Sequence, residues 1–165
     1  MDKTLIIQPE SGLQFDWKAI ALNPSAHHEA QIDLVAYKAL YINKIAQARA
    51  CGQEPVLVSL PIMDENRYFA YITRGMSMQE RKNVLFWLGG QTERLRNIHA
   101  LYNLSLFRLA AQQCVHLVDI TSPMLASTHF DDLLEQDGVT LSPAGEALVN
   151  NELVSLASRL SVLAS

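Results

Sequence analysis

Three short apolar runs stand out along the chain, and each is bounded by turn-forming residues. The first is Thr4 to Gln8, which ends at a Pro-Glu-Ser-Gly segment. The second is Pro55 to Leu60, between Gly52 and Pro61, and the third is Val115 to Ile120. Short runs of this kind, rich in β-branched residues, predict strands that are covered on both faces.

Helical patterns fill the stretches between these runs. Apolar residues recur at helical spacing over Ala30–Cys51, and again over Met78–Gln113, where the pattern breaks at Gly89-Gly90. A last helix is predicted to start after Ser142, a favourable N-cap followed by Pro, and to run to about Leu160.

The alternation of strand and helix predicts an α/β fold of three layers, with a parallel sheet of about three core strands between helices on both faces. The 165 residues suffice for one core, so we expect a single domain spanning residues 1–165. Three strands make a thin sheet for this class, where about five or six are usual. The stretches Gly12–His28 and Pro123–Asp132 are predicted to be loops.

The charge and hydropathy of the sequence argue against several classes of function. The net charge is −4 and the basic residues form no cluster, which argues against a nucleic-acid partner. The apolar stretch before Gln8 is four residues long, too short for a signal peptide or a membrane span. We therefore expect a cytoplasmic protein with no membrane association.

The cysteines and histidines give no sign of a metal or a cofactor. Cys51 and Cys114 belong to no Cys-x-x-Cys pair and have no histidine at ligand spacing, so they are interpreted as core thiols. His116 lies within the third apolar run and is expected to be a hydrogen-bonded core residue.

In parallel α/β sheets, functional groups collect at the carboxyl ends of the strands. After the second predicted strand, Tyr71 and Arg74 are candidates to line a cleft, and Arg74 could bind an anion. Aromatic side chains in this region also suit ordinary packing of a helix on a sheet. After the third strand, the chain leads to a loop that begins at Asp137 and precedes the last helix.

The segment Val118–Val149, which contains DGVTLSPAGEALV, resembles the C-terminal block of the SGNH hydrolases, also called the GDSL esterase and lipase family. In that family an Asp-Gly-x-His pattern precedes a helix containing a glycine. The resemblance implies a flavodoxin-like fold and ester hydrolysis by a serine, a histidine and an aspartate. It extends backward through four further strings: LVSLP (Leu57–Pro61), ENRYFAYITRG (Glu65–Gly75), VLFWLGG (Val84–Gly90) and HALYN (His99–Asn103).

The departures from the family pattern concern its catalytic groups. Asp137 matches the acid, but Thr140 stands at the histidine position, and a hydroxyl cannot serve as a general base near neutral pH. Ser11 stands where the Gly-x-Asn-Asp block has its asparagine. The block with the nucleophilic serine would precede this chain, so the resemblance implies an N-terminally truncated, non-catalytic domain.

Other roles for the same residues remain open. Asp137 is followed by glycine, which suits a tight turn, and Thr140 could donate a hydrogen bond to its carboxylate. Alternatively, Ser11 is a nucleophile, Asp137 an orienting acid, and His129 or a histidine of another subunit a displaced base. His129 also fits a plain exposed loop residue.

Three hypotheses of function follow. The first is a non-catalytic domain that forms a homodimer or binds a complementary chain, because the family's strand order would leave Thr4–Gln8 at an open sheet edge. The second is a hydrolase of a small-molecule ester with a rearranged or intersubunit site. The third is a small-molecule binding module near Asp137, Arg74 and Tyr71.

Overall fold

The sheet has three parallel strands in the order β1-β2-β3. The computed structural model describes residues 3–163, with side chains from 3 to 160. The strands are β1 (Thr4–Ile7), β2 (Glu54–Val58) and β3 (His116–Val118). In the register, Ile6 lies opposite Val56 and Leu57 lies opposite Leu117. The three predicted strands and their parallel arrangement are confirmed.

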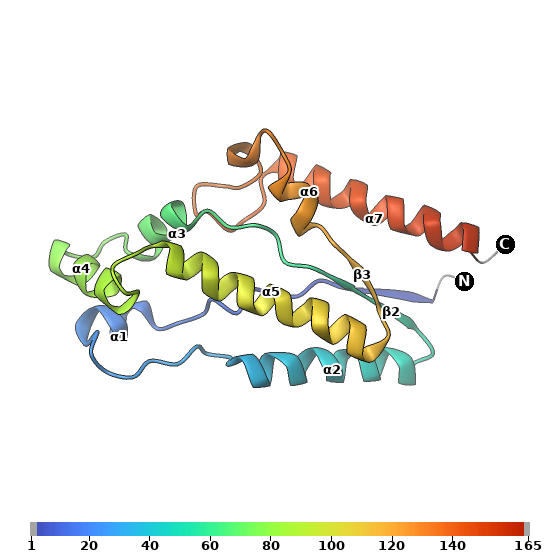
Figure 1. Ribbon diagram of the computed structural model, residues 1–165, viewed down its shortest axis with the longest axis horizontal. Coiled ribbons are helices and arrows are strands. Elements are labelled where there is room, and N and C mark those ends of the chain that lie inside the picture. The colour runs from blue at the N-terminus through green and yellow to red at the C-terminus, as the bar shows by residue number, and fades with distance from the viewer. Residues whose placement is uncertain (1–2, 164–165) are drawn as a thin grey trace.

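Helices cover both faces of this sheet, which confirms the three-layer fold. In Figure 1, α2 and α5 lie on one side of the strands and α7 on the other. The break predicted at Gly89-Gly90 separates α4 from α5, and Ser142 caps α7 by accepting a hydrogen bond from Gly145 N. The helices are α1 (Trp17–Leu22), α2 (Leu34–Ala50), α3 (Glu65–Ile72), α4 (Met78–Trp87), α5 (Glu93–Gln113), α6 (Thr121–Leu125), the 3-10 helix η1 (Phe130–Asp132) and α7 (Pro143–Leu163).

The two faces of the sheet carry separate apolar cores, because successive strand residues point to opposite sides. Ile7 and Leu57 pack into the core formed with α2 and α5. Val56 and Val58 point the other way and pack with Val149 of α7. Strands β2 and β3 therefore contribute to both layers of helices, as their apolar runs predict, whereas β1 contributes Leu5 and Ile7 to the core with α2 and α5.

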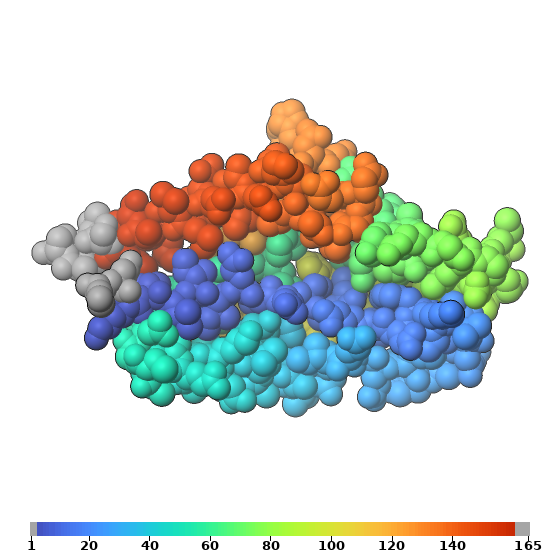
Figure 2. Space-filling model, turned by 180° about the vertical axis from the view of Figure 1, so that it is seen from behind, coloured from blue at the N-terminus to red at the C-terminus, as the bar shows by residue number. Residues whose placement is uncertain are grey.

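One edge of the sheet is the free side of β1. Among the strands of the described chain, β1 pairs only with β2, and Ile6 is 44% exposed. Figure 2 shows this N-terminal segment on the surface between α7 and α2. The carbonyl of Lys3 accepts a hydrogen bond from Glu54 N, so the backbone of Lys3 faces β2. Backbone N–H and C=O groups of successive strand residues point to alternate edges, and those of Ile6, three residues later, therefore face the open edge. The predicted apolar edge is confirmed.

Short helices occupy both stretches predicted to be loops. Helix α1 lies within Gly12–His28, and α6 with η1 overlaps Pro123–Asp132. The side chain of Asp16 accepts a hydrogen bond from Ala19 N and starts α1. These segments span six residues or fewer, which is too short for a helical periodicity to emerge from the sequence.

The cysteines and His116 are exposed, so their predicted burial is wrong. Cys51 and Cys114 directly follow the last residues of α2 and α5, where the helices end at the surface. Cys114 adopts a left-handed conformation, with φ of 51°. His116 occupies the first position of the edge strand β3. None of the helices between residues 3 and 163 is long and apolar enough to cross a membrane.

Candidate functional site

A buried polar network ties together the carboxyl ends of β2 and β3. The hydroxyl oxygen of Ser59 accepts hydrogen bonds from Ile120 N at 2.9 Å and Thr121 N at 3.2 Å. Asn103 of α5 accepts from Leu60 N at 2.8 Å, and its amide nitrogen donates to Thr121 Oγ1 at 3.0 Å. These side chains hold the backbone at the point where the strands end.

A serine and a histidine meet beside this network. Ser11, in the loop after β1, places Oγ 3.1 Å from Nδ1 of His99 on α5. The other ring nitrogen of His99 lies 2.7 Å from the carbonyl oxygen of Pro61, in the loop after β2. Ser11 Oγ also accepts a hydrogen bond from Leu13 N at 3.3 Å. The loops after two strands are thus joined through one imidazole.

The surroundings of His99 fix its protonation. A carbonyl oxygen can only accept, so Nε2 carries the proton that goes to Pro61, and neutral Nδ1 accepts from the Ser11 hydroxyl. The side chain is buried, and burial lowers the pKa of His99 although the Pro61 carbonyl opposes the shift. His99 is therefore neutral at pH 7.

The carboxylate of Asp137 is fully engaged by its own loop. Oδ1 accepts hydrogen bonds from Val139 N at 3.0 Å and Thr140 N at 2.9 Å. The Thr140 hydroxyl donates to Oδ2 at 2.6 Å, as the sequence predicts. Burial raises the pKa of Asp137, but the hydrogen bonds from Thr140 and Val139 outweigh it and hold the pKa below its usual range.

The Asp137 loop is locked against the start of α3 through Gly138. This glycine has φ of +74°, and a Cβ there would lie 2.5 Å from Asp64 O and 2.8 Å from Tyr68 N. Its carbonyl accepts a hydrogen bond from Asp64 N at 2.9 Å. The hydroxyl of Tyr68 donates to Leu13 O at 3.0 Å, so α3 contacts both the Asp137 loop and the loop after β1.

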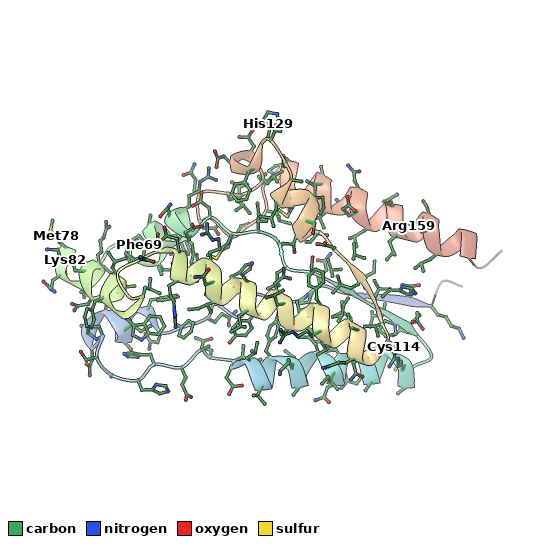
Figure 3. The ribbon with its side chains drawn as sticks, viewed as in Figure 1. Phe69, Met78, Lys82, Cys114, His129 and Arg159 are labelled. Atoms are coloured by element: carbon green, nitrogen blue, oxygen red, sulfur yellow. The ribbon has the colours of Figure 1, made fainter. Side chains whose placement is uncertain are left out.

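The structure does not bring His129 to either of its proposed partners. Its Nδ1 lies 3.8 Å from Oδ2 of Asp132, and both side chains are exposed. Figure 3 shows His129 at the outer tip of the segment between α6 and α7. Among residues 3–160, no hydrogen bond or ion pair joins it to Ser11 or Asp137. The imidazole beside Ser11 belongs to His99 instead.

Arg74 and Tyr71 form a stacked pair at the end of α3. The guanidinium carbon of Arg74 lies 3.7 Å from the centre of the Tyr71 ring, and Arg74 Nη1 donates to Tyr71 O at 3.2 Å. Both residues are exposed, and neither lines the cavity beside the first turn of α3 in the described part of the chain. The two side chains stack on each other at the surface, and a cleft beside them stays a prediction.

A cavity of about 510 Å³, which we call the main cavity, lies beside the first turn of α3. Its mouth carries an ion pair of 2.8 Å between Arg96 and Glu65. Ser11 lies outside it and lines a second cavity of about 260 Å³ with Tyr37 and Tyr41. The main cavity is lined by Pro61, Ile62, Met63, Asp64, Glu65, Asn66, Arg96, Asn97, His99, Ala100, Asn103, Thr121, Leu125 and Phe130.

Sequence reasoning assigned no role to His99. It lies 88 positions from Ser11, a separation that no local motif spans. A signal exists nonetheless, because His99 follows Leu95 and precedes Tyr102 and Leu106 at helical spacing on an apolar stripe. A polar residue on such a stripe is expected to be buried and hydrogen-bonded. No cluster of three or more potential metal ligands occurs in the described residues.

Comparison with known proteins establishes a fold. No family model matches the chain, and no curated protein matches it. Among solved structures, the crystal structure of the lipase/acylhydrolase from Enterococcus faecalis is similar, with a TM-score of 0.51 and 16% identity. The match covers 93% of this chain and 60% of that one, so the chain spans about three fifths of its length. The likeness supports the resemblance to SGNH hydrolases at the level of fold.

Proposed function

We propose that this chain is a hydrolase-fold domain without ester hydrolase activity, which works by pairing with a second copy through the open edge of β1. The observation that carries the proposal is the exposed position of Ile6 on an edge strand that pairs with β2 on one side and with no other described strand.

The lack of ester hydrolysis is supported by what surrounds Asp137. In a serine hydrolase the acid accepts a hydrogen bond from the imidazole that acts as base. In this chain, the Thr140 hydroxyl donates to Oδ2, while Oδ1 accepts two backbone N–H groups. The carboxylate organises a turn, and its side-chain partner cannot take up a proton near neutral pH.

Pairing is supported by the chemistry of the edge. Within residues 3–163, the outward backbone groups of Ile6 have no strand beside them, and such edges tend to add another strand. A groove of about 470 Å³ runs beside β1, and Lys44 is the one charged side chain among the described residues that line it. Two β1 strands in antiparallel orientation would join two sheets across a two-fold axis.

The test is the native mass of the purified chain by light scattering. One copy has a mass of 18.4 kDa, and the proposal expects twice that value. Ile6→Pro removes an outward N–H and an exposed side chain without removing a bond to β2, and it should give monomers. Leu22→Lys changes an exposed apolar residue on α1 and should leave the dimer intact. A monomeric wild type would refute the pairing.

A second candidate function rests on the contact between Ser11 and His99. A serine within reach of a neutral imidazole, which a third group orients, is the arrangement of an activated nucleophile. In an ester hydrolase, Ser11 Oγ would bond to the ester carbonyl carbon while its proton passes to His99 Nδ1. The alcohol would leave with that proton, and water would then release the acid and restore Ser11.

Covalent labelling separates the two candidates. A fluorophosphonate reacts with an activated serine and leaves an adduct that mass spectrometry can assign to a residue. The non-catalytic proposal expects no adduct on Ser11 after prolonged exposure. An adduct on Ser11 that disappears in His99→Gln, in a folded protein, would establish the second candidate in its place.

A further inference from the structure

The cavity of about 510 Å³ takes no part in the proposed pairing, and its volume lies within the range of small-molecule sites. It opens at the carboxyl ends of β2 and β3, on a different side of the sheet from the β1 edge. Its walls come from the loop after β2, the first turn of α3, the first half of α5, α6 and η1. Segments far apart in the sequence thus enclose one space.

The body of the cavity is apolar. Ile62 and Met63 are buried and form one part of its wall, and Phe130 and Leu125 form another. Leu125 is 62% exposed, so a large apolar side chain faces solvent beside the opening. An apolar ligand that covered these side chains would remove their surface from water, which is the main source of affinity in such sites.

The buried polar residues of the lining, His99 and Asn103, are already hydrogen-bonded within the protein. His99 bonds to Ser11 and Pro61, and Asn103 bonds to Leu60 and Thr121. Among the described residues, no buried side-chain nitrogen or oxygen lacks a partner. A polar group of a ligand would therefore find no unpaired partner in the interior of the cavity, so we expect the part of the ligand that lies there to be apolar.

The mouth of the cavity sets the charge of the ligand. Two carboxylates, those of Asp64 and Glu65, line it together with one guanidinium, that of Arg96. Glu65 pairs with Arg96, and Oδ2 of Asp64 lies 3.5 Å from Nε of Arg67, so a charged head group would find no unpaired counterion among the described lining residues. Arg96 bonds to Glu65 through Nη1 and is 55% exposed, which leaves N–H donors for an uncharged polar group. The side-chain amide of Asn97 adds a donor and an acceptor.

We propose that this cavity binds a small uncharged amphiphile, with an apolar chain directed inward and one hydroxyl head at the Arg96 end. The site is independent of pairing through β1, and Ser11 lies outside it, although His99 both lines the cavity and contacts Ser11. It also differs from the region of Arg74 and Tyr71, which lies at the other end of α3.

Methionine methyl groups report directly on this site. Met63 lines the cavity, whereas Met78 is 75% exposed on α4 at the far end of the molecule (Figure 3). With ¹³C-methyl-methionine protein at pH 7.5, 1-hexanol should shift the Met63 signal in a saturable way and leave Met78 in place. Hexanoate, which has the same chain with a charged head, should bind at least about tenfold more weakly, because its carboxylate would lose water without gaining an unpaired cation.

A pair of variants on one helix checks the location. Ala100 is an exposed residue of α5 that lines the cavity, and Ala100→Trp should fill it and abolish the Met63 shift. Ala111→Trp changes an exposed alanine of the same helix outside the cavity and should bind 1-hexanol like the wild type. Equal shifts at Met63 and Met78, or unchanged binding by a folded Ala100→Trp variant, would refute the site. Hexanoate binding as tight as that of 1-hexanol would refute the uncharged ligand.

Discussion

Ser11 Oγ lies 3.1 Å from His99 Nδ1 and joins the loop after β1 to helix α5. The same imidazole reaches the loop after β2 through Pro61. In the account proposed for this chain, the contact is a structural tie between the carboxyl ends of two strands. A structural role and a catalytic role of Ser11 lead to different expectations for the stability of the fold and for ester hydrolysis.

Ser11→Ala should lower the free energy of unfolding by about 1 kcal/mol, because it removes the hydrogen bonds with His99 and Leu13. Urea denaturation measures this change. Ser127→Ala is the matched control, since Ser127 Oγ accepts one bond from His129 N in an exposed loop and should matter less. Equal free energies of unfolding for Ser11→Ala and the wild type would show that the contact does not stabilise the fold.

The burial of His99 predicts a pH dependence of stability. Its pKa is lowered in the folded protein, so below about pH 6.5 the unfolded chain binds a proton that the folded chain does not. Stability should therefore fall as the pH drops from 7.5 to 5.5, by at most about 1.4 kcal/mol for each pH unit. Chemical denaturation at a series of pH values measures the slope.

His99→Gln should flatten this slope, since glutamine does not titrate. His116→Gln serves as the control, because His116 is exposed at the start of β3 and should leave the slope unchanged. If both variants keep the wild-type slope, another group is responsible for the pH dependence.

Gly138→Ala should be more destabilising than Gly75→Ala, although both glycines have left-handed backbones, with φ of +74° and +76°. Placing alanine in a left-handed conformation costs about 1 kcal/mol at either position. A Cβ at Gly75 meets nothing within 4 Å, whereas at Gly138 it would lie 2.5 Å from Asp64 O. We expect at least about 2 kcal/mol of additional loss at Gly138 in thermal or urea unfolding. Equal losses would mean that the loop does not dock on α3.

Thr140→Val should raise the pKa of Asp137, because the hydroxyl that donates to Oδ2 is removed. The lowered pKa favours the folded state above about pH 4, and this contribution is lost as the pH falls through the folded value. The carboxyl ¹³C signal of Asp137 measures the pKa. Thr140→Ser keeps the hydroxyl and should retain the wild-type value, so a Thr140→Ser shift as large as that of Thr140→Val would contradict the assigned bond.

The sheet and the long helices could be predicted because their signals are local. The apolar run at Pro55–Leu60 fixes a strand buried on both faces, and Gly89-Gly90 fixes the boundary between α4 and α5. Helix α1 was missed, since its six residues hold less than two turns. Cys51 and Cys114 were misplaced because composition does not tell whether a helix end reaches the surface.

The site was predictable in part. The bond from Thr140 to Asp137 spans three residues, and a local pattern can indicate it. The pairing of Ser11 with His99 and the cavity beside α3 arise from tertiary packing, in which segments far apart in sequence meet. One sequence does not fix which of its five histidines approaches a given serine.

The central claim is that this hydrolase fold carries no ester hydrolase site, and the measurement that tests it most directly is the hydrolysis of p-nitrophenyl butyrate by the purified chain. The account predicts that the wild type and Ser11→Ala both release p-nitrophenol at the rate of the buffer. Turnover by the wild type that is lost in Ser11→Ala and retained in Ser127→Ala would contradict the account and assign the nucleophile to Ser11.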